Sequence, residues 1–325
     1  MTPVNLVTGL LGSGKTSTIR HLLAHKPAHE QWAVLVNEFG SVGIDGALLT
    51  DDGIEVRQVA GGCICCVSSP LFRVGLTRLL REAKPDRVLI EPSGLAHPAA
   101  VVDMLRDAYF ARAVRLDAVV CIVDPRQLGD AQAMPLLHDQ LQLADLVVAN
   151  KADLAAPADL ARLATLLAGL YPPKAISAAV EHGRLDPAWL ASPSTVEAAS
   201  APTPPSHLLM RLPRSPAGEV TERLQRQAGA GHVAYGASWP PARVFDGKRL
   251  HGWLALQQAN PALRRAKGVV RIGNTWWQFN LSGTEREWQT SAWRRDSRIE
   301  LIFDEAGAPA GEQLERELTD LLLPA

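Results

Sequence analysis

An octapeptide near the amino terminus has the residue types and spacing that bind a polyphosphate. Residues 9–16 read GLLGSGKT, which fits the pattern G-x-x-x-x-G-K-[ST] at every fixed position. An apolar run over residues 4–8 precedes it, and apolar residues at helical spacing follow within residues 16–26. A strand, a glycine turn and a helix in this order direct backbone N–H groups and the positive helix end at one point. The sequence therefore predicts a phosphate-binding loop here.

The positions of this loop have separate predicted tasks. The Lys15 ammonium is expected to hold the β- and γ-phosphates of a nucleotide, and the Thr16 hydroxyl a Mg²⁺ ion. The alternative is a glycine-rich turn that matches by chance, but a random chain of this length holds roughly 0.01 such octapeptides. The loop indicates a nucleotide but no particular reaction. The residues assigned to nucleotide contacts are Gly9, Gly12, Ser13, Gly14, Lys15, Thr16 and Ser17.

Carboxylates at the ends of two further predicted strands are candidates for Mg²⁺ binding and catalysis. The strand predicted at residues 32–36 is followed by NEFGSVGID, in which Glu38 is the first Mg²⁺ candidate and Asp45 the second. The alternative is that both are solvated loop acids. The strand predicted at residues 86–91 ends in EPSG, so Glu91 and Gly94 lie where P-loop proteins sense the γ-phosphate and the metal.

These acids and the loop lysine make up the predicted catalytic group. Lys15 and Mg²⁺ neutralise the charge that develops on the phosphate, and Glu91 or Glu38 orients the attacking water. No glutamine or arginine stands out as a catalytic finger, so slow intrinsic turnover is expected.

Three of the four cysteines fall within four positions, in the stretch GGCICC. Cys63, Cys65 and Cys66 lie just before a helix predicted to begin at residues 69–70, and the dipole of that helix favours the thiolate form, which binds metal. Three soft ligands so close together suit Zn²⁺, Cu⁺ or another thiophilic ion. Two alternatives stay open: a redox pair of Cys63 and Cys66, whose spacing fits, and buried structural thiols. Cys121 lies in an apolar run and is predicted to be a buried strand residue.

A tetrapeptide that follows the apolar run at residues 146–149 indicates which base is bound. Asn150, Lys151 and Asp153 belong to the sequence NKAD. At a strand end the Asp153 carboxylate can accept hydrogen bonds from N1–H and the exocyclic amine of guanine, whereas adenine has no matching donors. The motif therefore predicts GTP. The last strand of this domain is predicted at residues 175–177, and Ser177 at its end lies where guanine-contacting loops often end such domains, so it is a further candidate.

Length and composition bound the kinds of protein this can be. The chain has 325 residues, 47% of them hydrophobic and 21% charged, with a net charge of −1. It exceeds the size at which one core usually stops growing, so two domains are expected. The near-neutral charge argues against nucleic acid and membrane as partners. Without a run of 18 apolar residues or a leader-like amino terminus, the protein is expected to be cytoplasmic, where thiols stay reduced.

The expected fold is an α/β P-loop domain, with a mostly parallel sheet flanked by helices, followed by a smaller α+β domain. The predicted division is residues 1–190, a linker with a possible helix at 219–227 over residues 191–230, and residues 231–325. In the second domain a strand is predicted at residues 232–239 and a hairpin at Gly273-Asn274. One helix is predicted to begin at Asp246 and a final helix to span residues 313–323, both on one face of the sheet. Its tryptophans are expected to pack in the core and edges rather than stack bases, and otherwise to offer a partner surface.

The chain resembles the CobW-like P-loop GTPases, which act as metallochaperones or metal insertases. The resemblance rests on GLLGSGKT, NEFG followed by GID, GGCICC, EPSGLAHP and NKAD, in that order, and on RAKGVVRI in the second domain. It implies GTP hydrolysis coupled to the handling of zinc or cobalt by Cys63, Cys65 and Cys66. Two features depart from the family: Val36 and Ser41 stand where many members have glutamates, some of which contact metal, and no histidine-rich run is present.

The expected function is therefore that of a GTPase metallochaperone. Its cofactors are GTP, Mg²⁺ and Zn²⁺ or Co²⁺, and its partners a metalloenzyme client and, with nucleotide bound, a second copy of the chain. One alternative is a nucleotide-gated regulatory switch whose cysteines sense metal or redox state. Another is a small-molecule P-loop kinase, in which NKAD would have no task.

Overall fold

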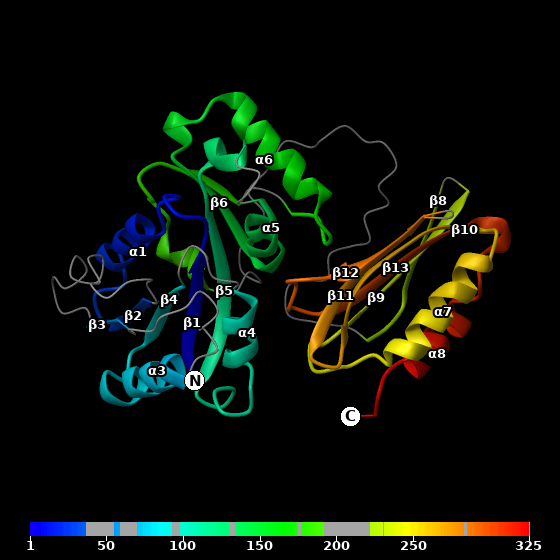
Figure 1. Ribbon diagram of the computed structural model, residues 1–325, viewed down its shortest axis with the longest axis horizontal. Helices are drawn as coiled ribbons and strands as arrows, with labels where there is room; N and C mark the ends of the chain where they lie inside the picture. Colours follow the sequence, from blue (N-terminus) through cyan, green and yellow to red (C-terminus); the bar gives the residue numbers. More distant parts are fainter. Residues whose placement is uncertain are drawn as a thin grey trace. The chain divides into compact units, whose positions relative to one another are not determined.

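The chain separates into two compact units, Met1–Ser200 and Ala201–Ala325, each built around one sheet (Figure 1). The computed structural model describes residues 1–36, 55–58, 70–92, 98–129, 134–174, 177–191, 222–229, 231–282 and 285–324. Within these ranges no helix has both the length and the apolar character needed to cross a membrane.

The first unit contains a seven-stranded sheet in the order β3-β2-β4-β1-β5-β6-β7, and every described pairing in it is parallel. Because parallel strands run in the same direction, their carboxyl ends meet at one edge, and central β1 delivers the phosphate loop to that edge. The strands are β1 (Thr2–Thr8), β2 (Trp32–Val36), β3 (Glu55–Gln58), β4 (Arg87–Glu91), β5 (Val114–Val123), β6 (Leu146–Asn150) and β7 (Ala178–Val180).

Helices cover both faces of this sheet, as a parallel sheet buried on both sides requires. On one face α1 packs together with η4, since Ile19, Leu22 and Leu190 belong to one apolar cluster. The other face is covered by α3 and α4 in a second cluster and by α5 and α6 in a third. This is the predicted P-loop fold. The elements are α1 (Lys15–Ala24), α3 (Pro70–Glu82), α4 (Ala99–Leu105), η2 (Pro125–Gly129), α5 (Met134–Leu143), η3 (Ala152–Leu154), α6 (Pro157–Gly169) and η4 (Pro187–Leu190).

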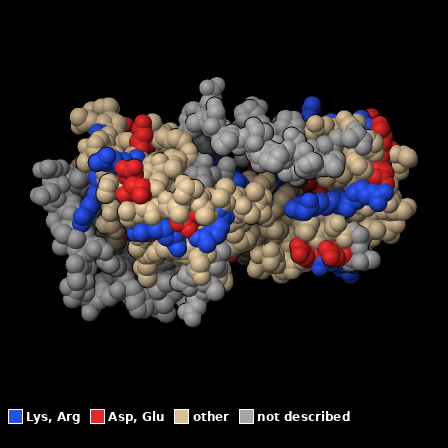
Figure 2. Space-filling view, turned by 90° about the horizontal axis from the view of Figure 1, so that it is seen from above, with Lys and Arg blue, Asp and Glu red and all other residues tan. Residues whose placement is uncertain are grey.

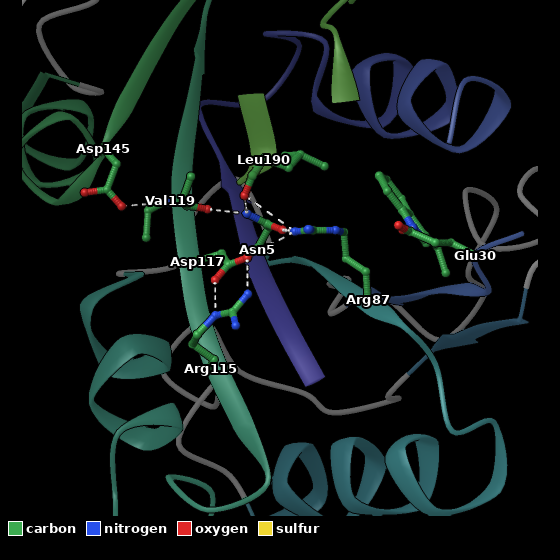
Figure 3. A network of polar contacts seen from close by, with 10 residues as sticks. Asn5, Glu30, Arg87, Arg115, Asp117, Val119, Asp145 and Leu190 are labelled. Atoms are coloured by element: carbon green, nitrogen blue, oxygen red, sulfur yellow. Dashed lines mark hydrogen bonds and ion pairs between the residues drawn. The ribbon is translucent and has the colours of Figure 1, made fainter. Parts of the chain in front are cut away.

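A buried polar network ties β1 to its neighbours (Figure 3). The Asn5 amide donates to Ala118 O at 3.0 Å and to Leu190 O at 2.8 Å. Arg87 donates to the Asn5 side-chain oxygen and lies 3.4 Å from Asp117, a buried carboxylate. Buried polar groups are stable only when they are hydrogen-bonded, so this network holds the strand that carries the phosphate loop against β5 and η4.

The second unit contains a six-stranded antiparallel sheet in the order β12-β11-β10-β13-β9-β8. Helices α7 and α8 both cover one face of it (Figure 1), as predicted for an α+β domain. Asp246 caps α7 by accepting from Arg249 N at 3.0 Å, and the predicted hairpin pairs Ile272 with Thr275. The elements are β8 (Gln225–Gly229), β9 (His232–Trp239), α7 (Gly247–Ala259), β10 (Leu263–Ile272), β11 (Thr275–Ser282), β12 (Glu285–Thr290), β13 (Ser297–Asp304), η6 (Glu305–Gly307) and α8 (Gly311–Asp320).

Two predicted elements are wrong in kind or position. The helix expected over residues 219–227 is replaced at its carboxyl end by strand β8, because these residues pair along the edge of β9. The last strand of the first unit begins at Ala178, after the predicted residues 175–177. The predicted domain boundaries at residues 190 and 230 stay predictions, since most of the linker lies outside the described residues.

The tryptophans of the second unit are mostly buried. Trp239 and Trp253 lie in its apolar core, which confirms the predicted packing role, and Trp276 and Trp293 are also buried. Trp288 packs on the core with its ring stacked on that of Phe279, 5.5 Å between centroids. These rings are therefore used in packing, and a partner surface built from them stays a prediction.

Surface charges of both signs are interspersed on the face of the molecule in Figure 2. Blue and red groups adjoin each other over the described surface visible there, in keeping with the net charge of −1. A large field of one sign is what captures polyanions without specificity. That nucleic acid is not a partner stays a prediction.

Candidate functional site

The loop between β1 and α1 has a backbone that only glycine tolerates at two positions. Gly9 has φ of 143° and Gly14 has φ of 100°. A Cβ atom would lie 2.2 Å from Ile122 O at Gly9, and 2.2 Å from the Asn150 amide nitrogen at Gly14. The glycines of the motif are therefore needed for the turn and for the close approach of neighbouring strands. A turn of this kind directs backbone N–H groups toward a bound anion.

Two polar side chains of the loop lie at the place predicted for the phosphates. The Lys15 side chain is held over the loop by a hydrogen bond from Nζ to Leu10 O at 2.9 Å, and the residue is only 7% exposed. The Ser13 hydroxyl is buried and has no hydrogen-bond partner among the described residues. Both sit at the amino end of α1, where the helix favours negative charge.

Glu91 lies beside the first turn of α1. Its Oε1 accepts a hydrogen bond from the Thr16 hydroxyl at 3.0 Å, and the residue is buried at the end of β4, the strand next to β1. A hydroxyl and a carboxylate are oxygen donors of the kind Mg²⁺ prefers, so this pair fits the cation that accompanies a nucleotide. The structure thus brings together two of the predicted site residues. Outside the described residues lie Glu38, Asp45, Gly94, Cys63, Cys65 and Cys66.

Three successive carbonyl oxygens of the loop each accept a hydrogen bond from a side chain that lies at the end of β6 or follows β5 or β6. The phosphate loop and the N-K-x-D motif are therefore one hydrogen-bonded unit, although they are far apart in sequence. Leu11 O accepts from Gln127 Nε2 at 3.0 Å, Gly12 O from Lys151 Nζ at 2.7 Å, and Ser13 O from Asn150 Nδ2 at 2.9 Å.

Asp124 holds the lysine of this unit in place. Its side chain, only 3% exposed directly after β5, lies 3.1 Å from Lys151 Nζ. It also accepts two hydrogen bonds from the Arg126 guanidinium, at 3.0 and 2.8 Å. Burial alone would raise the pKa of Asp124, but the hydrogen bonds from Arg126 and Lys151 outweigh it and lower the pKa to about 2. The carboxylate is therefore ionised throughout the physiological range.

Asp124 and Gln127 were not among the residues predicted from sequence. Both belong to the stretch DPRQ directly after an apolar strand, the same positional signal that singled out Glu91. That signal was sufficient to include Asp124 among the candidate site residues. It does not extend to Gln127, whose role depends on how closely η2 approaches Leu11 O.

The residues predicted to recognise the base, and the loop beside them, follow β6 and β7. Asp153, in η3, is exposed, so its predicted contact with guanine stays a prediction that its position allows. Asn150 Oδ1 accepts from the backbone N–H of Gly183 at 2.9 Å. Gly183 has φ of 71°, and a Cβ atom there would lie 2.6 Å from Thr18 N. The loop after β7 therefore lies directly against the first turns of α1.

The assignment of Ser177 to the nucleotide requires correction. Ser177 precedes β7, so it lies at the opposite end of that strand from the edge where the phosphate loop lies. Its backbone N–H donates to Val147 O at 2.8 Å, and its hydroxyl accepts from Val147 N at 3.2 Å. The side chain pairs with β6 at the start of the strand, because β7 begins at Ala178, after the residues predicted for it. The residues that follow β7 at the edge of the sheet with the phosphate loop are 181–183.

Cys121 is fully buried in β5, which confirms its predicted structural role. Burial raises the pKa of this thiol to about 12, so it is not a thiolate ligand at neutral pH. In the part of the chain that the structure describes, no group of three or more histidine, cysteine or acidic side chains is arranged to hold a metal ion. The metal site predicted at the cysteine cluster lies outside that part.

A parallel sheet with a G-x-x-x-x-G-K-T loop at its central strand, and with N-K-x-D residues bonded to that loop, defines a P-loop nucleotide-binding protein. The chain belongs to the CobW/HypB/UreG family. Residues 3–177 match the nucleotide-binding domain described as CobW/HypB/UreG, and residues 236–322 match the cobalamin synthesis protein cobW C-terminal domain.

Three named relatives align with most of the chain or with about half of it. The zinc chaperone YeiR of Escherichia coli is 39% identical over 311 residues, which is 93% of each chain. The zinc chaperone CobW of Pseudomonas aeruginosa is 36% identical over 203 residues, 52% of this chain and 54% of that protein. The zinc-regulated GTPase metalloprotein activator 1 of Saccharomyces cerevisiae is 30% identical over 177 residues, 46% of this chain and 41% of that protein.

Proposed function

We propose that this protein binds and hydrolyses GTP and uses the nucleotide cycle to bind a transition metal ion and deliver it to a client protein. The cargo is zinc or cobalt, held by Cys63, Cys65 and Cys66. Family membership supports the nucleotide chemistry, and the relative that aligns over 93% of both chains is named a zinc chaperone. The name of the yeast relative joins a GTPase to the activation of a metalloprotein.

The observation that carries the proposal is the bonding of N-K-x-D residues to the phosphate loop. Asn150 and Lys151 donate to Ser13 O and Gly12 O, so a nucleotide on the loop has its base end near η3, which carries Asp153. The first two residues of the motif hold the loop whichever base is bound. Selection of guanine therefore falls to Asp153, whose carboxylate accepts from the two guanine donors.

The residues of the loop divide the chemistry of hydrolysis between them. Lys15 neutralises the charge that develops on the transferred phosphoryl group. Thr16 and Glu91 would hold Mg²⁺, which when bound supplies further positive charge at the β- and γ-phosphates. Because Glu91 is already hydrogen-bonded to Thr16, we assign Glu91 to binding Mg²⁺ and Glu38 to orienting the attacking water. Asp45 is the second Mg²⁺ candidate.

The order of the strands supports a link between nucleotide and cargo. Val36, the last residue of β2, pairs with both Gln58 of β3 and Glu91 of β4. The carboxyl end of β3 therefore lies at the edge where the phosphate loop and Glu91 lie, and the cysteines follow β3 in the sequence. In the proposed cycle, GTP orders the loop around Glu38 and the cysteine segment and so assembles the metal site. Hydrolysis relaxes both and releases the ion.

Nucleotide selectivity tests the first step of this proposal. We expect GTP to bind much more tightly than ATP, and Asp153→Asn to weaken that preference by about 1–3 kcal/mol, because a paired contact to the base is lost. Affinities of the unmodified and variant proteins for both nucleotides are measured by calorimetric titration.

A matched control is Glu82→Gln, which neutralises an exposed acid at the carboxyl end of α3, before β4 begins and outside the loops of the nucleotide site. It should leave the preference for GTP unchanged. Equal affinities for GTP and ATP in the unmodified protein would overturn the assignment of the base.

A further inference from the structure

Two histidines lie side by side at the carboxyl end of α1, outside the nucleotide site. His21 is in the last turn of the helix and His25 is its C-cap residue. Their ring centroids are 4.0 Å apart and their planes are inclined by 28°. Residues four apart in a helix share one face, and His25 is exposed there. Two imidazoles are thus presented together on the surface of the first unit.

Hydrogen bonding determines which nitrogen of His25 is available. The His25 Nδ1 atom lies 2.8 Å from His21 O. A carbonyl oxygen only accepts, so Nδ1 carries the proton and donates it, which leaves the lone pair of a neutral ring on Nε2. Donation by one ring nitrogen to a backbone carbonyl is the usual arrangement of a histidine whose other nitrogen binds metal.

The end of the helix also favours a cation. The last carbonyl groups of α1 carry partial negative charge, and the His25 N–H contacts only the His21 and Leu22 oxygens among them. A positive charge next to His25 is therefore stabilised by the helix dipole. The positive charge of Arg184 acts on His21 and therefore disfavours a cation at this place. This opposition provides a test of its own.

We propose that His21 and His25 form a two-imidazole site for a divalent transition metal ion of the Zn²⁺, Ni²⁺ or Cu²⁺ kind. Imidazole nitrogens suit these ions, and two histidines four residues apart on a helix are a known chelating arrangement. The His25 ring keeps its hydrogen bond to His21 O, while the His21 ring turns about its Cβ–Cγ bond to bring a nitrogen onto the same ion, and water completes the coordination. The site is independent of the cysteine cluster and does not rest on the function proposed above. The competing explanation is that the two rings merely stack and cap the helix.

The test uses the full chain with Cys63, Cys65 and Cys66 replaced by Ser, titrated with Ni²⁺ alone. Cys121 does not compete, since it is fully buried. We expect one strong Ni²⁺ per chain, and a loss of affinity of roughly 100-fold in His21→Ala and in His25→Ala, because chelation by the second ring is removed. His29→Ala, the matched exposed control, should change nothing, and Arg184→Ala should tighten binding.

A second measurement reports the position of the ion directly. Paramagnetic Ni²⁺ should broaden the ring resonances of His21 and His25 before those of the other histidines, in this background and in the protein with all its cysteines. The second background keeps the test valid if the serine replacements disturb the fold. Unchanged affinity in His25→Ala, or first broadening at other histidines, would overturn the proposal. Because no nucleotide or client is present, failure here is distinguishable from failure of the proposed GTPase cycle.

Discussion

Lys15 is the residue on which nucleotide hydrolysis most depends. It supplies the only cationic side chain of the phosphate loop, and its ammonium is held over the loop by Leu10 O rather than in the apolar core. A lysine in this position acts on the phosphates and contributes little to packing. Its loss should therefore separate activity from folding.

We predict that Lys15→Ala abolishes GTP hydrolysis while the fold stays intact. Turnover is measured by phosphate release, and the fold by far-ultraviolet circular dichroism. Arg20→Ala, an exposed cation on the same helix, is the control and should keep full activity. Retained turnover in a correctly folded Lys15→Ala protein would show that this loop is not the active site.

Asp124 gives a prediction on pH and stability. Its pKa is about 2 in the folded protein against an ordinary value of 3.8, so its ionised form favours folding. A depressed pKa of this kind contributes stability that is fully present above about pH 4 and is lost as the pH falls toward 2. The difference corresponds to about 2 kcal/mol of unfolding free energy. Asp124→Asn should lower the unfolding free energy at pH 7 and remove this part of its acid dependence, as measured by urea denaturation from pH 7 to 2.

The same variant distinguishes a positioning role from a purely structural one. Without Asp124, Lys151 loses its ion pair and holds Gly12 O less firmly. We therefore expect weaker binding of GTP and GDP alike, with the preference over ATP unchanged, since Asp153 is intact. A loss of stability with unaltered nucleotide affinity would show that Asp124 acts on folding alone.

At the scale of elements, local patterns predicted most of what lies in the sheets. The strands predicted at residues 32–36 and 232–239 are β2 and β9, with the predicted bounds. They could be predicted because most side chains of these strands are buried and apolar, a pattern that is visible in the strand's own sequence. The prediction misplaced β7 and assigned part of β8 to a helix for the opposite reason. Their residues are strands because of the neighbours they pair with, and neither is an apolar run of that kind.

The site divides in the same way. Motif spacing placed Lys15, Thr16 and Glu91 together in advance, and the structure brings Glu91 to Thr16. Motif spacing did not predict the hydrogen bond from Asn150 to Ser13 O, a contact across 137 residues, or the one from Gln127 to Leu11 O. Such contacts depend on how two loops meet at the sheet edge, which a local sequence pattern does not contain.

The contact between the loop after β7 and α1 gives a prediction at this scale. Gly183→Ala should destabilise the first unit by about 1–3 kcal/mol, because a side chain is strained at φ of 71° and its Cβ would lie 2.6 Å from Thr18 N. Nucleotide affinity should fall with it, since Thr18 follows the phosphate loop. Gly129→Ala is the control, because its Cβ would meet nothing within 4 Å. Equal stability of the two variants in urea denaturation would contradict this account of the loop.

At the scale of the whole molecule, the two units match separate parts of one family. Residues 3–177 match its nucleotide-binding domain and residues 236–322 its C-terminal domain. The alignment with YeiR extends over 93% of both chains. A protein that keeps both parts together is suited to couple a nucleotide cycle to a second task, and the proposed task is delivery of a metal ion to a client.

The central claim is that nucleotide state controls the affinity for the metal cargo, and a competition titration with Zn²⁺ against a chromophoric chelator tests it most directly. The titration is done under reducing conditions with Mg²⁺ and a non-hydrolysable GTP analogue, with GDP, and without nucleotide. We predict that the analogue strengthens Zn²⁺ binding by about 1–3 kcal/mol and, by linkage, that Zn²⁺ strengthens binding of the analogue equally. Replacing Cys63, Cys65 and Cys66 by Ser should remove both the site and the coupling. The same Zn²⁺ affinity in all three nucleotide states would contradict the delivery mechanism, even if the cysteines bind the ion.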